Sequence, residues 1–233
     1  MKIIAMIPAR IGSQRLKFKN LALLNNKPLI SYAIEKAKKS GIFNDIYINS
    51  DHTIFEKIAK RYKIKFYLRN KSLGKSNTTS DQVVFDFLKN NKCDYLVWVN
   101  PIAPLQEIND IKKSVKYLIN HNINSLITVT NKKVHYLLKN KPINFEINKR
   151  FDKTQDLPAV SEMVYTLMMW NSKSFLRFYN KNKFAILHGK KFFYQISKQS
   201  SIIVKDKEDL NLIQNILSKK NNKIIYDKIL NLK

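Results

Sequence analysis

The chain has 233 residues, of which 44% are hydrophobic, with 43 Lys and Arg against 17 Asp and Glu and a single cysteine. This length allows one sizeable hydrophobic core, and the lone Cys93 excludes an internal disulfide framework or a cysteine-based metal site. No stretch approaches the roughly 18 uninterrupted apolar residues of a membrane span, and the apolar start stops at Arg10 without a small-residue cleavage site. We therefore expect a cytoplasmic protein that does not enter a membrane.

The formal net charge of +26 is the most unusual of these quantities. Such an excess suits a nucleic acid, an anionic membrane surface or an anionic small molecule as a partner. The lysines, however, are spread over the whole chain among many Asn and Ile residues, as in a general compositional bias. No RNA-binding aromatic motif, zinc-finger spacing or basic heptad pattern accompanies them. Nucleic acid is therefore a minor alternative, and we expect only a few of the charges to be functional.

Short apolar runs alternate with longer amphipathic patterns over the first half of the chain. Gly41 is expected to end the first helix, and Ser80 with Asp81 to cap the third. The alternation is typical of an α/β fold, a Rossmann-like, doubly wound and mainly parallel sheet with right-handed crossovers. Expected strands cover residues 3–8, 46–49, 64–68, 95–99 and 125–130, and expected helices cover residues 28–40, 53–62, 80–90 and 109–120.

The alternation breaks between residues 132 and 170, which are largely irregular and polar. The break ends in the apolar run 163–170, which fits a buried strand or a subunit contact. Farther on, we expect strands at residues 192–196 and 202–204 and a closing helix at residues 208–217. Since no linker divides the chain, we expect a single domain over residues 1–233, with 132–170 as a small inserted subregion that makes the contact of a homodimer.

A basic loop follows the first expected strand. Gly12 allows a tight turn, and Ser13 with exposed backbone N–H groups suits phosphate oxygens. Lysine and arginine side chains of this loop can neutralise a polyphosphate. A solvated basic loop is the plainer alternative, because the pattern is neither a dinucleotide fingerprint nor a P-loop. The cations are Arg10, Arg15, Lys17 and Lys19.

Several short motifs follow one another along nearly the whole chain: Ile7-Pro8-Ala9-Arg10, Gly12-Ser13, Lys19-Asn20-Leu21, Lys27-Pro28-Leu29-Ile30, Ser50-Asp51, Leu68-Arg69, Thr78-Thr79-Ser80, Asn100-Pro101 and Leu157-Pro158. In this order they resemble the acylneuraminate cytidylyltransferases, the enzymes that make CMP-sialic acid and related CMP-sugars. The first fifty residues carry the most specific part of the likeness. The resemblance implies an enzyme of surface glycan biosynthesis that uses CTP, an acidic sugar acceptor and Mg²⁺.

The resemblance also implies roles for single residues. Arg10 would reach the phosphates, and Lys19 would stabilise charge on the α-phosphate and the departing pyrophosphate. The remaining implied contacts are Ala9, with Gly12 and Ser13 of the loop, in the nucleotide pocket, Asn20 at the ribose or phosphate, Arg69 and Ser80 at the cytidine, and Asn100 and Gln155 at the acceptor. Arg69 could equally be a surface residue, and Ser80 simply a helix cap.

The chain departs from the family at the acceptor and at the metal. Asn100 replaces a usual glutamine, and the loop that follows lacks two hydroxyls and an arginine that suit an anionic sugar. At the positions of the paired metal-binding aspartates stand Ile203 and Lys205. Asp206 could hold the metal if the backbone slips by one residue, although capping of the next helix is its simpler role. Lys205 could instead replace the metal charge, or activity could be lost.

We therefore expect a nucleotidyltransferase that transfers CMP from CTP to a nonulosonic acid-like acceptor and releases pyrophosphate. A cytidylyltransferase for another acceptor, such as a phosphonate, and a catalytically impaired homologue that keeps the fold are the alternatives.

Overall fold

The computed structural model describes residues 1–218 and arranges them around a mixed sheet of seven strands. Along the sheet order β11-β7-β10-β6-β1-β4-β5, neighbours are parallel except at β10, which runs antiparallel to β6 and β7. The prediction of a doubly wound, mainly parallel α/β sheet is confirmed. The strands are β1 (Ile3–Ala9), β4 (Asp45–Ser50), β5 (Lys65–Leu68), β6 (Tyr95–Val99), β7 (Ser125–Lys132), β10 (Val160–Asn171) and β11 (Lys191–Gln195).

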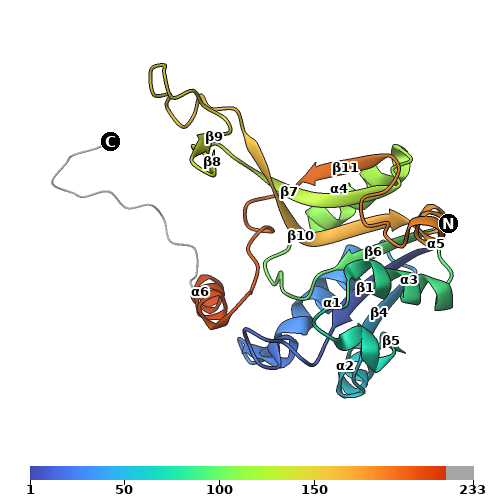
Figure 1. Ribbon diagram of the computed structural model, residues 1–233. Helices are drawn as coiled ribbons and strands as arrows, with labels where there is room; N and C mark the ends of the chain where they lie inside the picture. The colour runs from blue at the N-terminus through green and yellow to red at the C-terminus, as the bar shows by residue number, and fades with distance from the viewer. Residues whose placement is uncertain (219–233) are drawn as a thin grey trace.

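Helices cover both faces of this sheet (Figure 1). One face packs against α1 (Leu29–Ser40), α2 (Ile54–Tyr62) and α4 (Ile108–Asn120), and the other against α3 (Ser80–Asn90) and α5 (Ser172–Asn182). Gly41 ends α1 in the left-handed conformation, with φ of 67°, as predicted. The last described helix, α6 (Lys207–Ser218), packs over the segment after β1 instead of on the sheet. No helix within residues 1–218 is long and apolar enough to cross a membrane.

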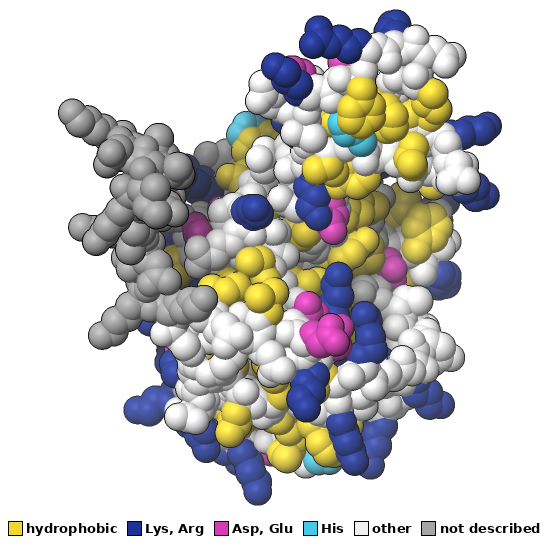
Figure 2. All heavy atoms as spheres, turned by 90° about the vertical axis from the view of Figure 1, so that its left-hand side faces the viewer, with side chains coloured by type: hydrophobic (Ala, Val, Ile, Leu, Met, Phe, Trp, Pro, Cys, Tyr) yellow, Lys and Arg dark blue, Asp and Glu magenta, His cyan; other side chains and the backbone are white. Residues whose placement is uncertain are grey.

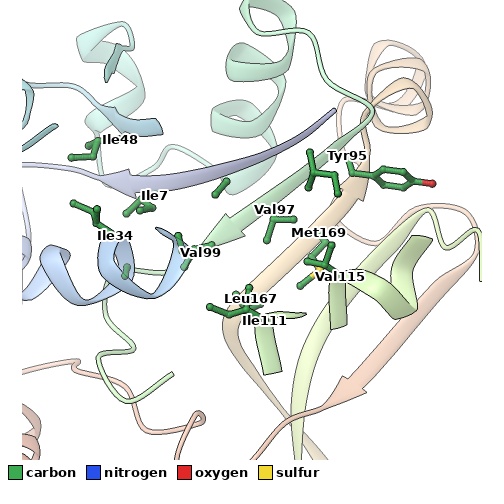
Figure 3. Close-up of a cluster of buried hydrophobic side chains, with 14 of the residues drawn as sticks. Ile7, Ile34, Ile48, Tyr95, Val97, Val99, Ile111, Val115, Leu167 and Met169 are labelled. Carbon is green, nitrogen blue, oxygen red and sulfur yellow. The ribbon is translucent and has the colours of Figure 1, made fainter. Parts of the chain in front are cut away.

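Side chains alternate between two hydrophobic cores along each central strand. Val97 and Val99 of β6 point into the core beneath α1 and α4, where Figure 3 places them near Leu167 and Ile111. Trp98 points to the opposite side, toward α3 and α5. Because Trp98 is also the next-to-last residue of β6, it lies at the carboxyl edge of the sheet on the α3 side.

An arm formed by residues 133–159 connects β7 to β10 and projects from the sheet (Figure 1). It contains a small hairpin of β8 (Leu137–Leu138) and β9 (Lys141–Pro142). His135 stacks on Phe151 at 4.0 Å between ring centroids and meets Phe145 edge-on. The inserted subregion is therefore shorter than the predicted 132–170, because residues 160–170 belong to β10 and the central sheet.

Three parts of the sequence prediction are wrong or incomplete. The expected strand 202–204 forms no ladder: Val204 donates one backbone hydrogen bond to Ile102 O, and its side chain packs beneath α6. The hairpin of β2 (Leu23–Leu24) and β3 (Lys27–Pro28) and the helix α5 were not predicted. The apolar run 163–170 is a buried strand, but it runs antiparallel and carries an irregularity in its pairing with β7 between Met163 and Met168.

Candidate active site

A cavity of about 380 Å³, here called the main pocket, opens at the carboxyl ends of β1 and β6. Its walls are the loop after β1, the segment that leads from the short 3-10 helix η2 (Lys71–Gly74) into α3, and the loop after β6. Ligands of open α/β sheets bind at this edge of the sheet. The main pocket is therefore the position at which the fold itself favours a ligand site.

Five cationic side chains line the main pocket, and no carboxylate from residues 1–218 lines it. On the face of the molecule that Figure 2 shows, Lys and Arg side chains are scattered instead of gathered in one patch. The main pocket thus stands out because its cations have no acidic neighbours in the lining. Such a cluster is self-repulsive until an anion binds among the charges. The five residues are Arg10, Arg15, Lys19, Arg69 and Lys75.

The loop after β1 brings Arg10 and Ser13 to the main pocket. The loop turns where Ser13 N donates to Ile11 O at 3.1 Å, and the N–H of Ile11 donates to Asp51 Oδ1 at 3.2 Å. Ala9 is fully buried at the end of β1 and, like Gly12, does not line the cavity. Gly12 lies at this turn, but an added Cβ would meet nothing within 4 Å and its φ is not positive, so the structure does not require a glycine there.

Lys19 and Asn20 open the 3-10 helix η1 (Lys19–Leu21) and both line the main pocket. Lys19 Nζ donates to Val204 O at 3.3 Å, which ties this segment to the chain before α6. Burial lowers the pKa of Lys19, Arg15 and Arg10 lower it further, and Asp209 and Asp206 oppose the shift. A desolvated ammonium beside two guanidinium groups gains stability when a phosphate arrives.

Arg69 is buried, with 4% of its surface exposed, so the surface alternative is excluded. Its Nη1 donates to Asn49 O at 3.2 Å, and its Nη2 lies 3.7 Å from Asp51 Oδ1. Desolvation lowers the pKa of Arg69, and Asp51 raises it. On the same side of the pocket, the helix cap is Thr79 and not the predicted Ser80, because Thr79 and Gln82 form a capping box. Ser80 lines the pocket and is not needed as the cap.

Three buried polar atoms of pocket-lining residues have no hydrogen-bond partner within the described part of the chain: Asn20 Oδ1, Arg69 Nε and Trp98 Nε1. Buried polar groups are almost always hydrogen-bonded, so orphaned atoms at a cavity mark places where a ligand or ordered water completes the site. They present both acceptor and donor character, as the amide oxygen accepts and the two N–H groups donate.

Lys75 and Trp98 are among the lining residues that the sequence did not reveal. Trp98 belongs to no motif of the sequence, but strand alternation along β6 points to it. Trp98 is the last residue of β6 whose side chain points toward α3, so it lies at the carboxyl edge of the sheet. Lys75 follows η2 on a loop, where no periodic pattern points to it.

The two predicted acceptor residues have different positions. Asn100 lines the main pocket, but its Nδ2 donates to Tyr165 O at 2.9 Å and its Oδ1 accepts from Ile102 N at 3.4 Å. The amide is therefore engaged in holding the loop after β6 against β10. Gln155 is not brought to this pocket: it lies exposed on the arm, where its backbone O accepts a hydrogen bond from Lys133 Nζ at 2.7 Å.

The residues present do not fit a protein-held Mg²⁺ ion. No cluster of three or more His, Cys, Asp or Glu residues occurs in residues 1–218, and Asp206 does not line the main pocket. Asp206 Oδ1 accepts from Asp209 N at 3.1 Å, and Asp209 Oδ2 accepts from Asp206 N at 3.3 Å. Mg²⁺ in such sites is held by one or two carboxylates together with the substrate phosphates, whereas neither of these two carboxylates lines the main pocket and both cap α6.

Comparisons with known proteins agree with this geometry. Residues 4–227 match a family model described as cytidylyltransferase. An N-acylneuraminate cytidylyltransferase of Escherichia coli O18:K1:H7 is 30% identical over 94% of this chain and 53% of that protein. A pseudaminic acid cytidylyltransferase of Campylobacter jejuni serotype O:23/36 is 30% identical over 76% of this chain and 81% of that protein. The chain thus spans about half the length of the N-acylneuraminate relatives it matches.

Among solved structures, a CMP:2-keto-3-deoxy-manno-octonic acid synthetase complexed with CTP superposes with a TM-score of 0.71. The match covers 94% of this chain and 99% of that one at 14% sequence identity. At such low identity the match supports the fold alone.

Proposed function

Because the chain belongs to the cytidylyltransferase family, we propose that it transfers CMP from CTP to an acidic sugar of the nonulosonic acid type and releases pyrophosphate. The observation that carries this proposal is the lining of the main pocket, with five cationic side chains and no carboxylate among residues 1–218. CTP brings a compact polyanion that such a lining neutralises.

In the proposed reaction an oxygen of the acceptor attacks the α-phosphorus of CTP, the bond to the bridging oxygen of the β-phosphate breaks, and pyrophosphate leaves. Arg10 and Lys19, with Arg15 and Lys75, hold the triphosphate and stabilise the charge that moves onto the leaving group. Ser13 and Asn20 complete the phosphate and ribose contacts, with the turn at Gly12 and the backbone of Ala9 shaping the loop.

Arg69 and Ser80 lie on the α3 side of the pocket, where we place the cytosine. The acceptor then approaches from the side of Asn100 and Ile102. The side-chain amide of Asn100 is already hydrogen-bonded to Tyr165 O, and Ile102 has no polar side-chain group. The loop after β6 therefore has few free polar groups for an anionic sugar. A different 2-keto sugar acid or a phosphonate is therefore included among the candidate acceptors, and Gln155 keeps its assigned acceptor role only as a prediction.

We further propose that the protein acts in the cytoplasm, where CTP is made, and that the arm is the contact of a homodimer. Figure 2 views the molecule from the side of the arm and shows hydrophobic surface in the upper part of this face as well as across its middle. Exposed apolar residues on the arm are Val134, Leu137, Leu138, Ile143, Ile147 and Phe151. Patches of this kind mark interaction surfaces.

The direct test is pyrophosphate release by the purified protein from CTP, with N-acetylneuraminate, pseudaminate, 2-keto-3-deoxy-octonate or a phosphonate as acceptor, each with Mg²⁺ present. We expect release that depends on both CTP and one acceptor, and much less with ATP, GTP or UTP. The proposal is wrong if the protein neither binds CTP nor releases pyrophosphate from it. Binding of CTP without turnover on any acceptor would favour the catalytically impaired homologue, which the replacement of the paired aspartates by Ile203 and Lys205 suggests.

A further inference from the structure

Asp51 lies directly after β4 at the carboxyl edge of the sheet, with 10% of its side chain exposed. One carboxylate oxygen, Oδ1, accepts the hydrogen bond from Ile11 N at 3.2 Å and lies 3.7 Å from Arg69 Nη2. The other oxygen, Oδ2, points at Gly74, where an added Cβ would come within 2.2 Å of it. A side chain at this position would therefore require the Asp51 side chain to move, because all three of the nearest atoms belong to it.

The three contacts of Asp51 belong to three separate segments that line the main pocket. Ile11 is in the loop that carries Arg10 and Ser13, Arg69 follows β5, and Gly74 ends η2 directly before Lys75. Asp51 itself does not line the main pocket. A single side chain outside the cavity thus touches the backbone or side chain of each of these segments.

The negative charge of Asp51 also stabilises the buried guanidinium of Arg69. Arg69 is buried, and desolvation together with Arg10 lowers its pKa, whereas Asp51 is the largest influence that raises it. A buried guanidinium without a nearby anion is costly, and it would turn toward solvent if space allowed. The carboxylate therefore favours one orientation of Arg69, the one in which its Nη1 bonds to Asn49 O.

We propose that Asp51 is a positioning residue of the nucleotide site: it orients Arg69 and holds the loop after β1 and the segment before α3 in register with each other. That the ligand is CTP rests on the proposed function, whereas the contacts of Asp51 do not depend on it. Asp51 acts on CTP only through Arg69 and through the two backbone segments.

The sign of the effect on CTP affinity separates positioning from simple electrostatics. A carboxylate near a cationic pocket repels a triphosphate, so its removal alone would strengthen CTP binding. Loss of positioning acts in the opposite direction. We expect Asp51→Ala to raise the dissociation constant of CTP by about 10- to 100-fold, the range that corresponds to the loss of one hydrogen bond to a charged group.

Two further variants divide the role of Asp51 into its parts. Asp51→Asn keeps an oxygen that can accept from Ile11 N but loses the charge that faces Arg69, so its loss of affinity should be smaller than that of Asp51→Ala. Gly74→Ala should weaken CTP binding while Asp51 is present, and less in the Asp51→Ala background, because that background lacks the two closest atoms, Oδ2 at 2.2 Å and Cγ at 2.6 Å, and keeps only Cβ at 2.9 Å. Asp45→Asn is the matched control, since Asp45 is an ion-paired aspartate at the opposite end of β4.

The experiment combines calorimetric CTP titration with backbone hydrogen exchange in the free protein. Faster exchange in residues 10–15 and 71–79 of Asp51→Ala, with unchanged exchange in Asp45→Asn, would support the proposal even if the wild type failed to turn over CTP. Unchanged exchange in both segments, or tighter CTP binding by Asp51→Ala, would overturn it. Failure of the wild type to bind CTP would instead refute the proposed function, and the exchange data alone would then decide the role of Asp51.

Discussion

Asp206 and Asp209 cap each other at the start of α6: Asp206 Oδ1 accepts from Asp209 N at 3.1 Å, and Asp209 Oδ2 accepts from Asp206 N at 3.3 Å. This reciprocal arrangement accounts for both carboxylates at the place where the family resemblance led us to look for a metal site. The helix-capping role of Asp206, which the sequence also allowed, is the one that the hydrogen bonds support.

Replacement of Asp206 distinguishes a cap from a metal ligand. Asp206→Ala removes the acceptor for Asp209 N–H and should cost about 1 kcal/mol, which lowers Tm by about 2–4 °C in a chain of this size. Asp206→Asn should keep the wild-type Tm, because asparagine caps helices as well as aspartate does. Both variants should keep pyrophosphate release. A Tm like that of the wild type combined with loss of activity in Asp206→Asn would show that the carboxylate binds the metal after all.

Lys19 should matter for the chemical step and for its pH dependence. Lys19→Ala should lower kcat by about 10²–10³-fold, the usual effect of removing one preorganised charge from a transition state. Burial lowers the pKa of Lys19, so this ammonium loses its proton at a lower pH than an ordinary lysine, and activity should fall on the alkaline side as pH rises through that lowered pKa. Lys19→Arg, which stays charged, should move the alkaline limb to higher pH. An alkaline limb that does not move would show that another group controls it.

The order of the sheet strands and α-helices up to β7 was predictable because each buried strand is a short apolar run and each helix has one apolar face, whereas the small β2–β3 hairpin was not. The direction of β10 was not, since an apolar run such as 163–170 carries no information on which neighbours it pairs with. The segment 202–204 was mistaken for a strand because its apolar side chains pack beneath α6, and burial under a helix produces the same pattern as burial in a sheet.

The candidate site divides in a similar way. Arg10, Ser13, Lys19 and Asn20 were found because they are close in sequence and follow one strand, so their proximity needs no knowledge of the fold. The roles of Trp98 and Asp51 depend on which face of a strand a side chain occupies and on contacts with segments far along the chain. Those relations arise only when β1, β4, β5 and β6 are placed side by side.

Trp98 should report nucleotide binding through its fluorescence. The chain has two tryptophans, of which Trp98 lines the main pocket and Trp170 is fully buried with its Nε1 donating to Ile186 O at 2.9 Å. Bound CTP should change the environment of Trp98, whose own Nε1 has no partner in residues 1–218, and should leave Trp170 unaffected. CTP should therefore change the emission of the wild type but not of Trp98→Phe, which retains Trp170. An equal change in both proteins would place the nucleotide elsewhere.

The arm should control the oligomeric state. Leu137 and Leu138 of its hairpin are 57% and 64% exposed. Burial of these apolar side chains against a second copy of the chain would favour dimer formation. We expect the wild type to be a dimer by light scattering, and the double variant Leu137→Asp/Leu138→Asp to be a folded monomer, because these residues lie outside the cores. Leu23→Asp is the matched control: Leu23 is 62% exposed on the hairpin of β2 and β3, away from the arm, and this variant should stay dimeric. A monomeric wild type, or a double variant that remains a dimer, would rule out this part of the arm as the dimer contact.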